Sequence, residues 1–277
     1  MTAVTLPPHK QDLKSYYESM RGSLEDKLFF MDELPEESVA VLVDYGAGDG
    51  ALLREVAASF SGWGPYLVAY DRAYEHHGFF ADIPAPSLET CAWPPVLKKI
   101  KGRKSCLILS SVIHEVLTAD PECWDTWWAD IEDAGFDYIV IRDTAVSWRT
   151  YTECDDLADL RVAYHWLHPG PETTSFAGRL AAHAKMATAD SDGYVSHAEY
   201  LHFLLKYRYV DNWERELAEN YIPLPAEVLR GNVLASGKYR LKHYEHYTLP
   251  FLKEVVKADF GIDLVDPTHV KMILEKT

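Results

Sequence analysis

The chain has 277 residues and a formal net charge of −16, with 43 acidic and 27 basic side chains. Binding to duplex DNA depends on neutralising phosphates, so this excess of negative charge makes DNA an unlikely partner. The composition, 48% hydrophobic and 25% charged, is typical of a globular protein, and no apolar run is long enough to span a membrane. The four cysteines lack zinc or redox spacing, and residues 1–10 lack the apolar stretch of a secretory signal. These features favour a reducing cytoplasm.

Residues 9–34 predict one or two helices that precede the first strand. Leu13, Tyr16, Tyr17 and Met20 recur at the spacing of one helix face. Such a helix either covers a ligand site or only packs against the rest of the fold.

Residues 39–53 predict a strand, a glycine turn and a helix. An apolar run ends at Asp44, and Gly46, Gly48 and Gly50 follow at alternate positions before a segment with helical spacing. Glycines turn the chain sharply and let a ligand lie against bare backbone amides. An ordinary glycine-rich turn without a ligand is the alternative.

The spacing differs from the G-x-G-x-x-G of dinucleotide folds, and Asp44 would repel a pyrophosphate. A ligand with a cationic end would be favoured. The stretch resembles motif I of the class I S-adenosylmethionine-dependent methyltransferases. The resemblance implies an α/β fold with a Rossmann-like, mostly parallel sheet whose last strand is antiparallel. It also implies that Asp44 and the three glycines bind S-adenosyl-L-methionine.

Two further acids follow the glycine turn. Residues 66–70 predict a buried strand that ends at Asp71, where a carboxylate can accept hydrogen bonds from both ribose hydroxyls of an adenosine ligand. The family resemblance assigns Asp71 this role, and it suggests Asp82 for the adenine amino group. Asp82 follows Asp71 so closely that either the second crossover is abbreviated or Asp82 is a loop residue.

Residues 105–117 predict a buried strand that runs into a polar end. Ser110, His114 and Glu115 would lie at the carboxyl edge of the sheet, where ligands of open α/β folds bind. We expect Ser110 to contact the cofactor and His114, with Glu115, to be catalytic. A neutral histidine can act as a general base, and the alternative is a helix-opening residue that only binds the backbone.

The next two segments predict a helix and a buried strand. Residues 121–133 contain Trp124, Trp127 and Trp128, which favour packing against the sheet over a ligand cage. The strand at 136–143 ends in Arg142 and Asp143, which either act at the functional edge or pair with neighbours as structure.

The rest of the chain predicts a helical block and a final pair of strands. Strands at 238–247 and 269–274 would flank a helix at 252–260, as in the last part of the methyltransferase sheet. The predicted organisation is therefore amino-terminal helices in 1–35, a cofactor-binding core in 36–144, a helical insertion or lid after the fifth strand in 145–236, and completion of the core in 237–277.

Residues 188–199 partly match the calcium loop of an EF-hand. Its first position is Thr188 instead of the usual aspartate, and a helix cap at Ser196 explains the same residues.

The sequence thus predicts a methyltransferase that uses S-adenosylmethionine on a small-molecule or nucleotide acceptor. One alternative is a protein that binds the cofactor and methylates nothing, and another is a nicotinamide oxidoreductase. RNA and protein acceptors stay open, because a site can be locally basic within an acidic chain.

Overall fold

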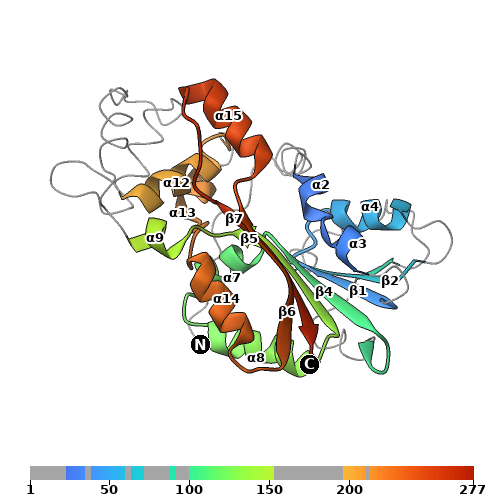
Figure 1. Cartoon of the computed structure of the whole chain (residues 1–277). Coiled ribbons are helices and arrows are strands. Elements are labelled where there is room, and N and C mark those ends of the chain that lie inside the picture. Colours follow the sequence, from blue (N-terminus) through green and yellow to red (C-terminus); the bar gives the residue numbers. More distant parts are fainter. Residues whose placement is uncertain are drawn as a thin grey trace.

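The computed structural model describes residues 23–34, 39–59, 64–71, 88–90, 100–152, 196–209 and 213–277. Within this part of the chain, seven strands form one sheet (Figure 1). They are β1 (Val41–Tyr45), β2 (Tyr66–Tyr70), β3 (Leu88–Thr90), β4 (Ser105–Ser110), β5 (Tyr138–Thr144), β6 (Tyr239–Tyr247) and β7 (His269–Lys276).

The strand order is β3-β2-β1-β4-β5-β7-β6. All neighbours from β3 to β5 are parallel, and β7 is antiparallel to both β5 and β6. The central strands β1 and β4 are apolar and buried, as parallel strands covered on both faces must be. This is the predicted Rossmann-like class I methyltransferase sheet, including its antiparallel last strand.

The third strand, β3, pairs in parallel with β2 and begins at Leu88, so Asp82 precedes this strand in the chain. Asp82 itself lies outside the described residues, and its contact with adenine stays a prediction.

Helices cover both faces of the sheet (Figure 1). On one face lie α7 (Ile113–Ala119), α8 (Trp124–Ala134) and α14 (Ala226–Leu234), and on the other lie α3 (Phe30–Glu33) and α4 (Ala51–Ser59). Alternate residues of one strand point to opposite faces, so Val41 and Val43 join the first core and Leu42 joins the second.

The tryptophans of α8 pack as predicted. Trp128 is buried in the core beneath the sheet, and the Trp124 ring stacks on it with the centroids 5.6 Å apart. Trp127 donates a hydrogen bond from its indole nitrogen to the Tyr45 hydroxyl over 3.2 Å.

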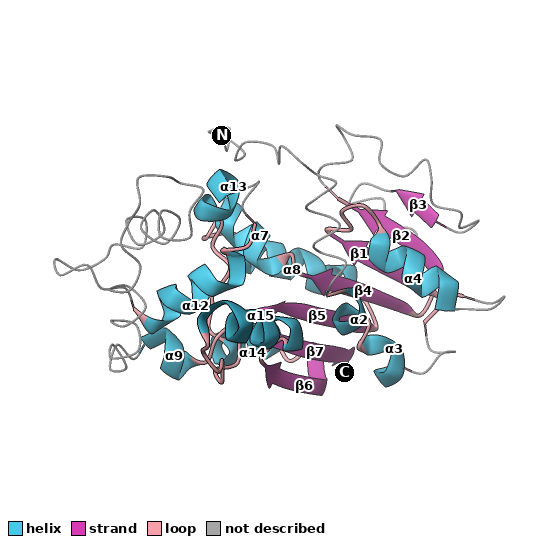
Figure 2. Ribbon diagram, turned by 90° about the horizontal axis from the view of Figure 1, so that it is seen from above, coloured by secondary structure: helices cyan, strands magenta, loops and turns pink. Residues whose placement is uncertain are grey.

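Helices beyond the carboxyl ends of the parallel strands share a separate apolar core (Figure 2). We call them the helical block, and they are α12 (His197–Lys206), α13 (Trp213–Ala218) and α15 (Pro250–Phe260). The short helix α9 (Trp148–Thr152) lies against α12. The division of residues between insertion and core differs in two helices. α14, within the predicted insertion 145–236, packs on the sheet, whereas α15, from the predicted core segment 237–277, packs in the helical block.

The amino end of α12 explains part of the partial calcium loop. Ser196 is the cap residue of this helix, and its hydroxyl accepts a hydrogen bond from the Glu199 amide over 3.2 Å. Residues 188–195 lie outside the described part, so calcium binding there stays a prediction. Among the described helices, none has the length and apolar character that a membrane span needs.

Candidate active site at the carboxyl edge of the sheet

The glycine turn after β1 needs its glycines. The φ angles of Gly46, Gly48 and Gly50 are +80°, +53° and +73°, a region that side chains with a Cβ rarely adopt. The amides of Gly46 and Ala47 donate to the Tyr70 carbonyl over 2.8 and 3.1 Å, which ties the turn to the end of β2. The backbone is therefore held in one compact conformation at the edge of the sheet.

Gly46 also lets the glycine turn lie close to Val112. A Cβ at this position would lie 2.6 Å from Cγ2 of Val112, the residue that precedes α7. The turn thus lies directly against the segment that carries His114, and the two predicted parts of the site are neighbours.

Asp71 lies beside the glycine turn. Its carboxylate accepts a hydrogen bond from the Gly48 amide over 2.8 Å. The structure therefore brings together the glycine turn and the acid at the end of β2, which the sequence placed 23 positions apart.

Asp44 is the buried acid of β1, with 3% of its surface exposed. Burial raises its pKa to about 7; the charge of Asp71 adds to this effect and the charge of Lys27 opposes it. Asp44 can therefore gain or lose its proton near neutral pH.

Lys27 is the last residue of α2 (Leu24–Lys27), a short helix that the sequence did not connect with chemistry. Burial lowers its pKa to about 8, repulsion from Arg142 adds to this, and the carboxylates of Asp44, Asp143 and Glu115 oppose it. The ammonium group therefore interacts electrostatically both with Asp44 of β1 and with the acids around His114.

α2 is anchored through Asp26. Its carboxylate pairs with the Arg142 guanidinium at 2.8 Å and with Lys271 Nζ at 2.8 Å, and it accepts a hydrogen bond from the Tyr247 hydroxyl. Burial acts to raise the pKa of Asp26, but these partners together lower it. Arg142 thus has a structural role, which is one of the two that the sequence predicted for it. Of the predicted amino-terminal helices, the residues Leu13, Tyr16, Tyr17 and Met20 lie outside the described part of the chain.

Two serines end β4. Ser110 is buried, and within the described part of the chain its hydroxyl has no hydrogen-bond partner. Ser111 adopts a φ of +57° and its hydroxyl accepts a hydrogen bond from Arg142. A buried hydroxyl without a protein partner is the kind of group that a ligand or a water molecule satisfies.

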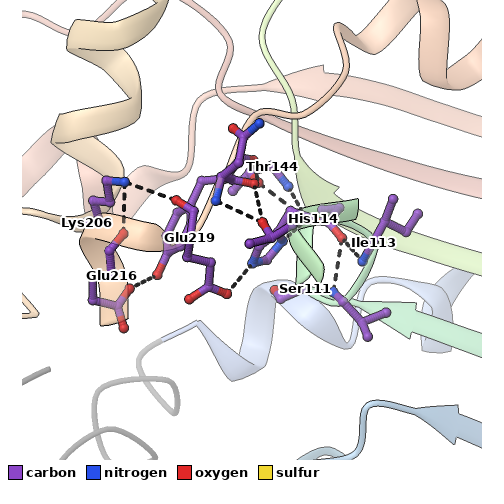
Figure 3. A network of polar contacts seen from close by, with 12 residues as sticks. Ser111, Ile113, His114, Thr144, Lys206, Glu216 and Glu219 are labelled. Atoms are coloured by element: carbon purple, nitrogen blue, oxygen red, sulfur yellow. Dashed lines mark hydrogen bonds and ion pairs between the residues drawn. The ribbon is translucent and has the colours of Figure 1, made fainter. Parts of the chain in front are cut away.

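His114 lies on the first turn of α7 and is held by Asp143 of β5 (Figure 3). Its Nδ1 is 2.5 Å from Asp143 Oδ1. The other oxygen of Asp143 accepts hydrogen bonds from the amides of Val112 and Ile113 over 3.0 and 2.7 Å. Asp143 thus caps the helix and fixes the orientation of the imidazole at once.

The opposite edge of His114 faces Glu219, a residue that follows α13. Its Nε2 lies 3.6 Å from Glu219 Oε1, and its ring centroid lies 5.0 Å from that of Tyr221. Burial alone would lower the pKa of His114, but Asp143 and Glu219 raise it to about 10. The sequence analysis considered a neutral histidine, whereas the two flanking carboxyl groups favour the charged form of this imidazole.

Glu115 is half-buried beside His114. The donor atoms of His114, Glu115 and Glu219 all lie within 4.8 Å of one another. The two predicted catalytic residues are therefore joined by a third residue that the sequence interpretation missed.

Glu219 is positioned by buried groups of α12 (Figure 3). Lys206 Nζ lies 3.1 Å from the Glu219 carbonyl oxygen and 2.9 Å from that of Glu216, and it also contacts His202 Nε2 at 3.0 Å. The Tyr221 hydroxyl contacts the Glu216 carboxylate. These contacts hold the segment after α13 against the sheet edge.

Comparison of the sequence with protein-family models and with curated proteins finds no match. Solved structures of similar fold include a SAM-dependent methyltransferase from Archaeoglobus fulgidus, 15% identical with a TM-score of 0.47, covering 95% of this chain and 98% of that one. The plantazolicin methyltransferase BamL is 12% identical with a TM-score of 0.47, covering 97% and 91%. The pyocyanin biosynthetic protein PhzM is 11% identical with a TM-score of 0.49, covering 95% and 57%.

Proposed function

We propose that the chain binds S-adenosyl-L-methionine at the carboxyl edge of its sheet and transfers the methyl group to a small-molecule or nucleotide acceptor. The observation that carries the proposal is the contact between the glycine turn and Asp71, with buried Asp44 beneath them and His114 next to them. The bare turn can admit the cofactor, and Ser110 offers a buried hydroxyl without a protein partner in the described residues.

Three parts of the chain would hold the cofactor. Asp44 would bind its amino-acid end beside the glycine turn, because an ionised carboxylate favours a cationic group. Asp71 would accept hydrogen bonds from the ribose while it keeps its bond from Gly48. When bound, the cofactor supplies an activated methyl group on its sulfonium.

The acceptor would lie at the Nε2 edge of His114, between Glu115 and Glu219. A charged His114 can hold an acceptor that reacts as an anion, and Glu219 is the carboxyl group best placed to take a proton from a neutral one. Asp143 keeps the imidazole in place during the reaction. His114 can itself act as a base only after its own proton has left.

The test combines binding with product analysis. Titration calorimetry with S-adenosylmethionine and with S-adenosylhomocysteine is expected to show binding, and NAD is expected to show none. Incubation with pools of small molecules and nucleotides, followed by mass spectrometry, is expected to find a product heavier by one methylene. The proposal is wrong if neither cofactor form binds.

A cofactor-binding protein without methyl transfer is the second candidate. Cofactor binding without any methylated product in the same screen would support this alternative.

A further inference from the structure

His114, Glu115 and Glu219 form a group of metal-binding side chains at the base of the proposed acceptor site. One donor atom from each lies within 4.8 Å of the others. Two of the residues are buried and the third is half-buried. They come from α7 and from the segment after α13, two regions that only the fold brings together.

The distance between His114 and Glu219 fits two ligands of one ion. At 3.6 Å, Nε2 and Oε1 are too far apart for a good hydrogen bond. Nitrogen and oxygen ligands bind transition metals at about 2.0–2.2 Å each, so two ligands of one ion lie up to about 4 Å apart. The observed gap therefore fits two ligands of one shared ion.

His114 is oriented as metal-binding histidines are. Metal-binding imidazoles almost always donate their second nitrogen to a carboxylate or a carbonyl. Here Nδ1 is 2.5 Å from Asp143, and Asp143 is itself fixed by the amides of Val112 and Ile113. This arrangement directs Nε2 toward the two glutamates.

The charge around His114 also favours a cation. Three carboxyl groups, those of Asp143, Glu115 and Glu219, lie around the His114 imidazole. Lys27 offsets part of their charge through its coupling to Asp143 and Glu115, and Arg215 lies 3.8 Å from the far oxygen of Glu219. A divalent ion in place of the ring proton would balance the carboxylates more fully, since burying unbalanced charge is costly.

We propose that His114, Glu115 and Glu219 bind one divalent transition-metal ion, with Mn²⁺ and Zn²⁺ as the best matches to one nitrogen and two oxygen donors. Mg²⁺ and Ca²⁺ prefer oxygen donors, so the imidazole selects against them. The ion would polarise an oxygen atom of the acceptor, and this catalytic role rests on the proposed methyl transfer. The metal site itself does not.

The experiment measures metal binding without any cofactor. The full chain is stripped with a chelator and titrated with Mn²⁺, and the signal of free Mn²⁺ is followed by electron paramagnetic resonance; Zn²⁺ is measured by competition with a chromogenic chelator. We expect one ion per chain and at least about tenfold weaker binding in Glu115→Gln and Glu219→Gln, since changes even beyond the ligands cost about tenfold or more. Glu122→Gln, at an exposed glutamate of the same region, is the matched control and is expected to bind as the parent chain does.

Glu219 is buried, so circular dichroism must show that its variant folds; Glu115 is only half-buried, and its variant keeps the test decisive if Glu219→Gln does not fold. The proposal is overturned if the parent chain shows no saturable binding of either ion, or if Glu115→Gln binds as tightly as Glu122→Gln. Equal binding of Mg²⁺ would overturn the role of the imidazole. A chain that binds metal but no S-adenosylmethionine would refute the proposed function alone.

Discussion

The Gly48 amide donates a hydrogen bond to the Asp71 carboxylate over 2.8 Å, and this contact joins the turn after β1 to the end of β2. Both partners were expected to bind different parts of the cofactor. Their direct contact means that the two halves of the cofactor site are positioned together.

Replacing Asp71 with asparagine tests this arrangement. The neutral amide can accept fewer and weaker hydrogen bonds, so we expect affinity for S-adenosylhomocysteine to fall by about tenfold, the loss of one charge-assisted hydrogen bond. Titration calorimetry measures the change. Asp133→Asn, at a largely exposed side chain of α8, should bind as the parent chain does. Equal affinities in the two variants would contradict the role of Asp71.

The affinity for S-adenosylmethionine should rise with pH. The pKa of Asp44 is raised to about 7, so below pH 7 the carboxyl is mostly neutral and attracts a cationic ligand poorly. Between pH 6 and 7.5 its ionised fraction rises by roughly fivefold to tenfold. Lys27, with a pKa of about 8, begins to lose its charge over the same range, and the reduced repulsion acts in the same direction.

Calorimetry across this pH range checks the prediction, with Asp44→Asn as the comparison. The variant keeps the titrations of the ligand and of Lys27 and loses that of the carboxyl, so its affinity should rise much less with pH than that of the parent chain. An equally steep rise in Asp44→Asn would show that Asp44 is not the group responsible.

Gly46→Ala should destabilise the fold by two effects. The φ of +80° costs a non-glycine residue about 1–2 kcal/mol. The new Cβ would also meet Val112 Cγ2 at 2.6 Å, and such overpacking costs about 1–3 kcal/mol more. Urea unfolding measures the sum.

Gly102→Ala is the matched control for this substitution. Its φ is +71°, but nothing lies within 4 Å of the added Cβ, so only the backbone term of about 1–2 kcal/mol should appear. Adding Val112→Ala to Gly46→Ala should restore part of the stability that the contact with Val112 costs. Equal destabilisation by the two glycine variants would mean that the contact with Val112 relaxes without cost.

Lys206→Met should separate turnover from cofactor binding. Its ammonium group is fully buried and bonds the carbonyls of Glu216 and Glu219, so its removal leaves buried acceptors unsatisfied at a cost of about 1–3 kcal/mol. We expect methyl transfer to fall because Glu219 loses its support, while affinity for S-adenosylhomocysteine stays the same. Lys257→Met, at a half-exposed lysine of α15, should change neither. Weaker cofactor binding in Lys206→Met would contradict a role confined to Glu219.

The sequence predicted the parts of the site whose signals are local. The three glycines, Asp44 and Asp71 follow from strand, turn and spacing, because a parallel sheet places consecutive strand ends at one edge. β3 was not predicted, because it has only three residues, too few for a periodic pattern. The sequence could not assign α14 and α15 to the sheet core or to the helical block. Each helix has an apolar face, and only the fold shows which of the two cores that face packs against.

Nothing in the sequence pointed to Glu219 or Lys27 as residues of the site. Glu219 follows α13 about a hundred residues after His114, and its place depends on buried contacts from Lys206 and His202 that only the fold creates. Lys27 is one charged residue in a short helix, and nothing in its neighbours distinguishes it from a solvated lysine. The charged state of His114 was missed for the same reason, since Glu219 supplies one of its two acidic neighbours.

Helix α7 supplies His114, and the segment beyond α13 supplies the glutamate that faces it. Under the proposed methyl transfer, the cofactor and the acceptor are therefore held by different parts of one polypeptide. Substitutions in the segment beyond α13 are then expected to change the rate of the reaction and to leave binding of the methyl donor unchanged.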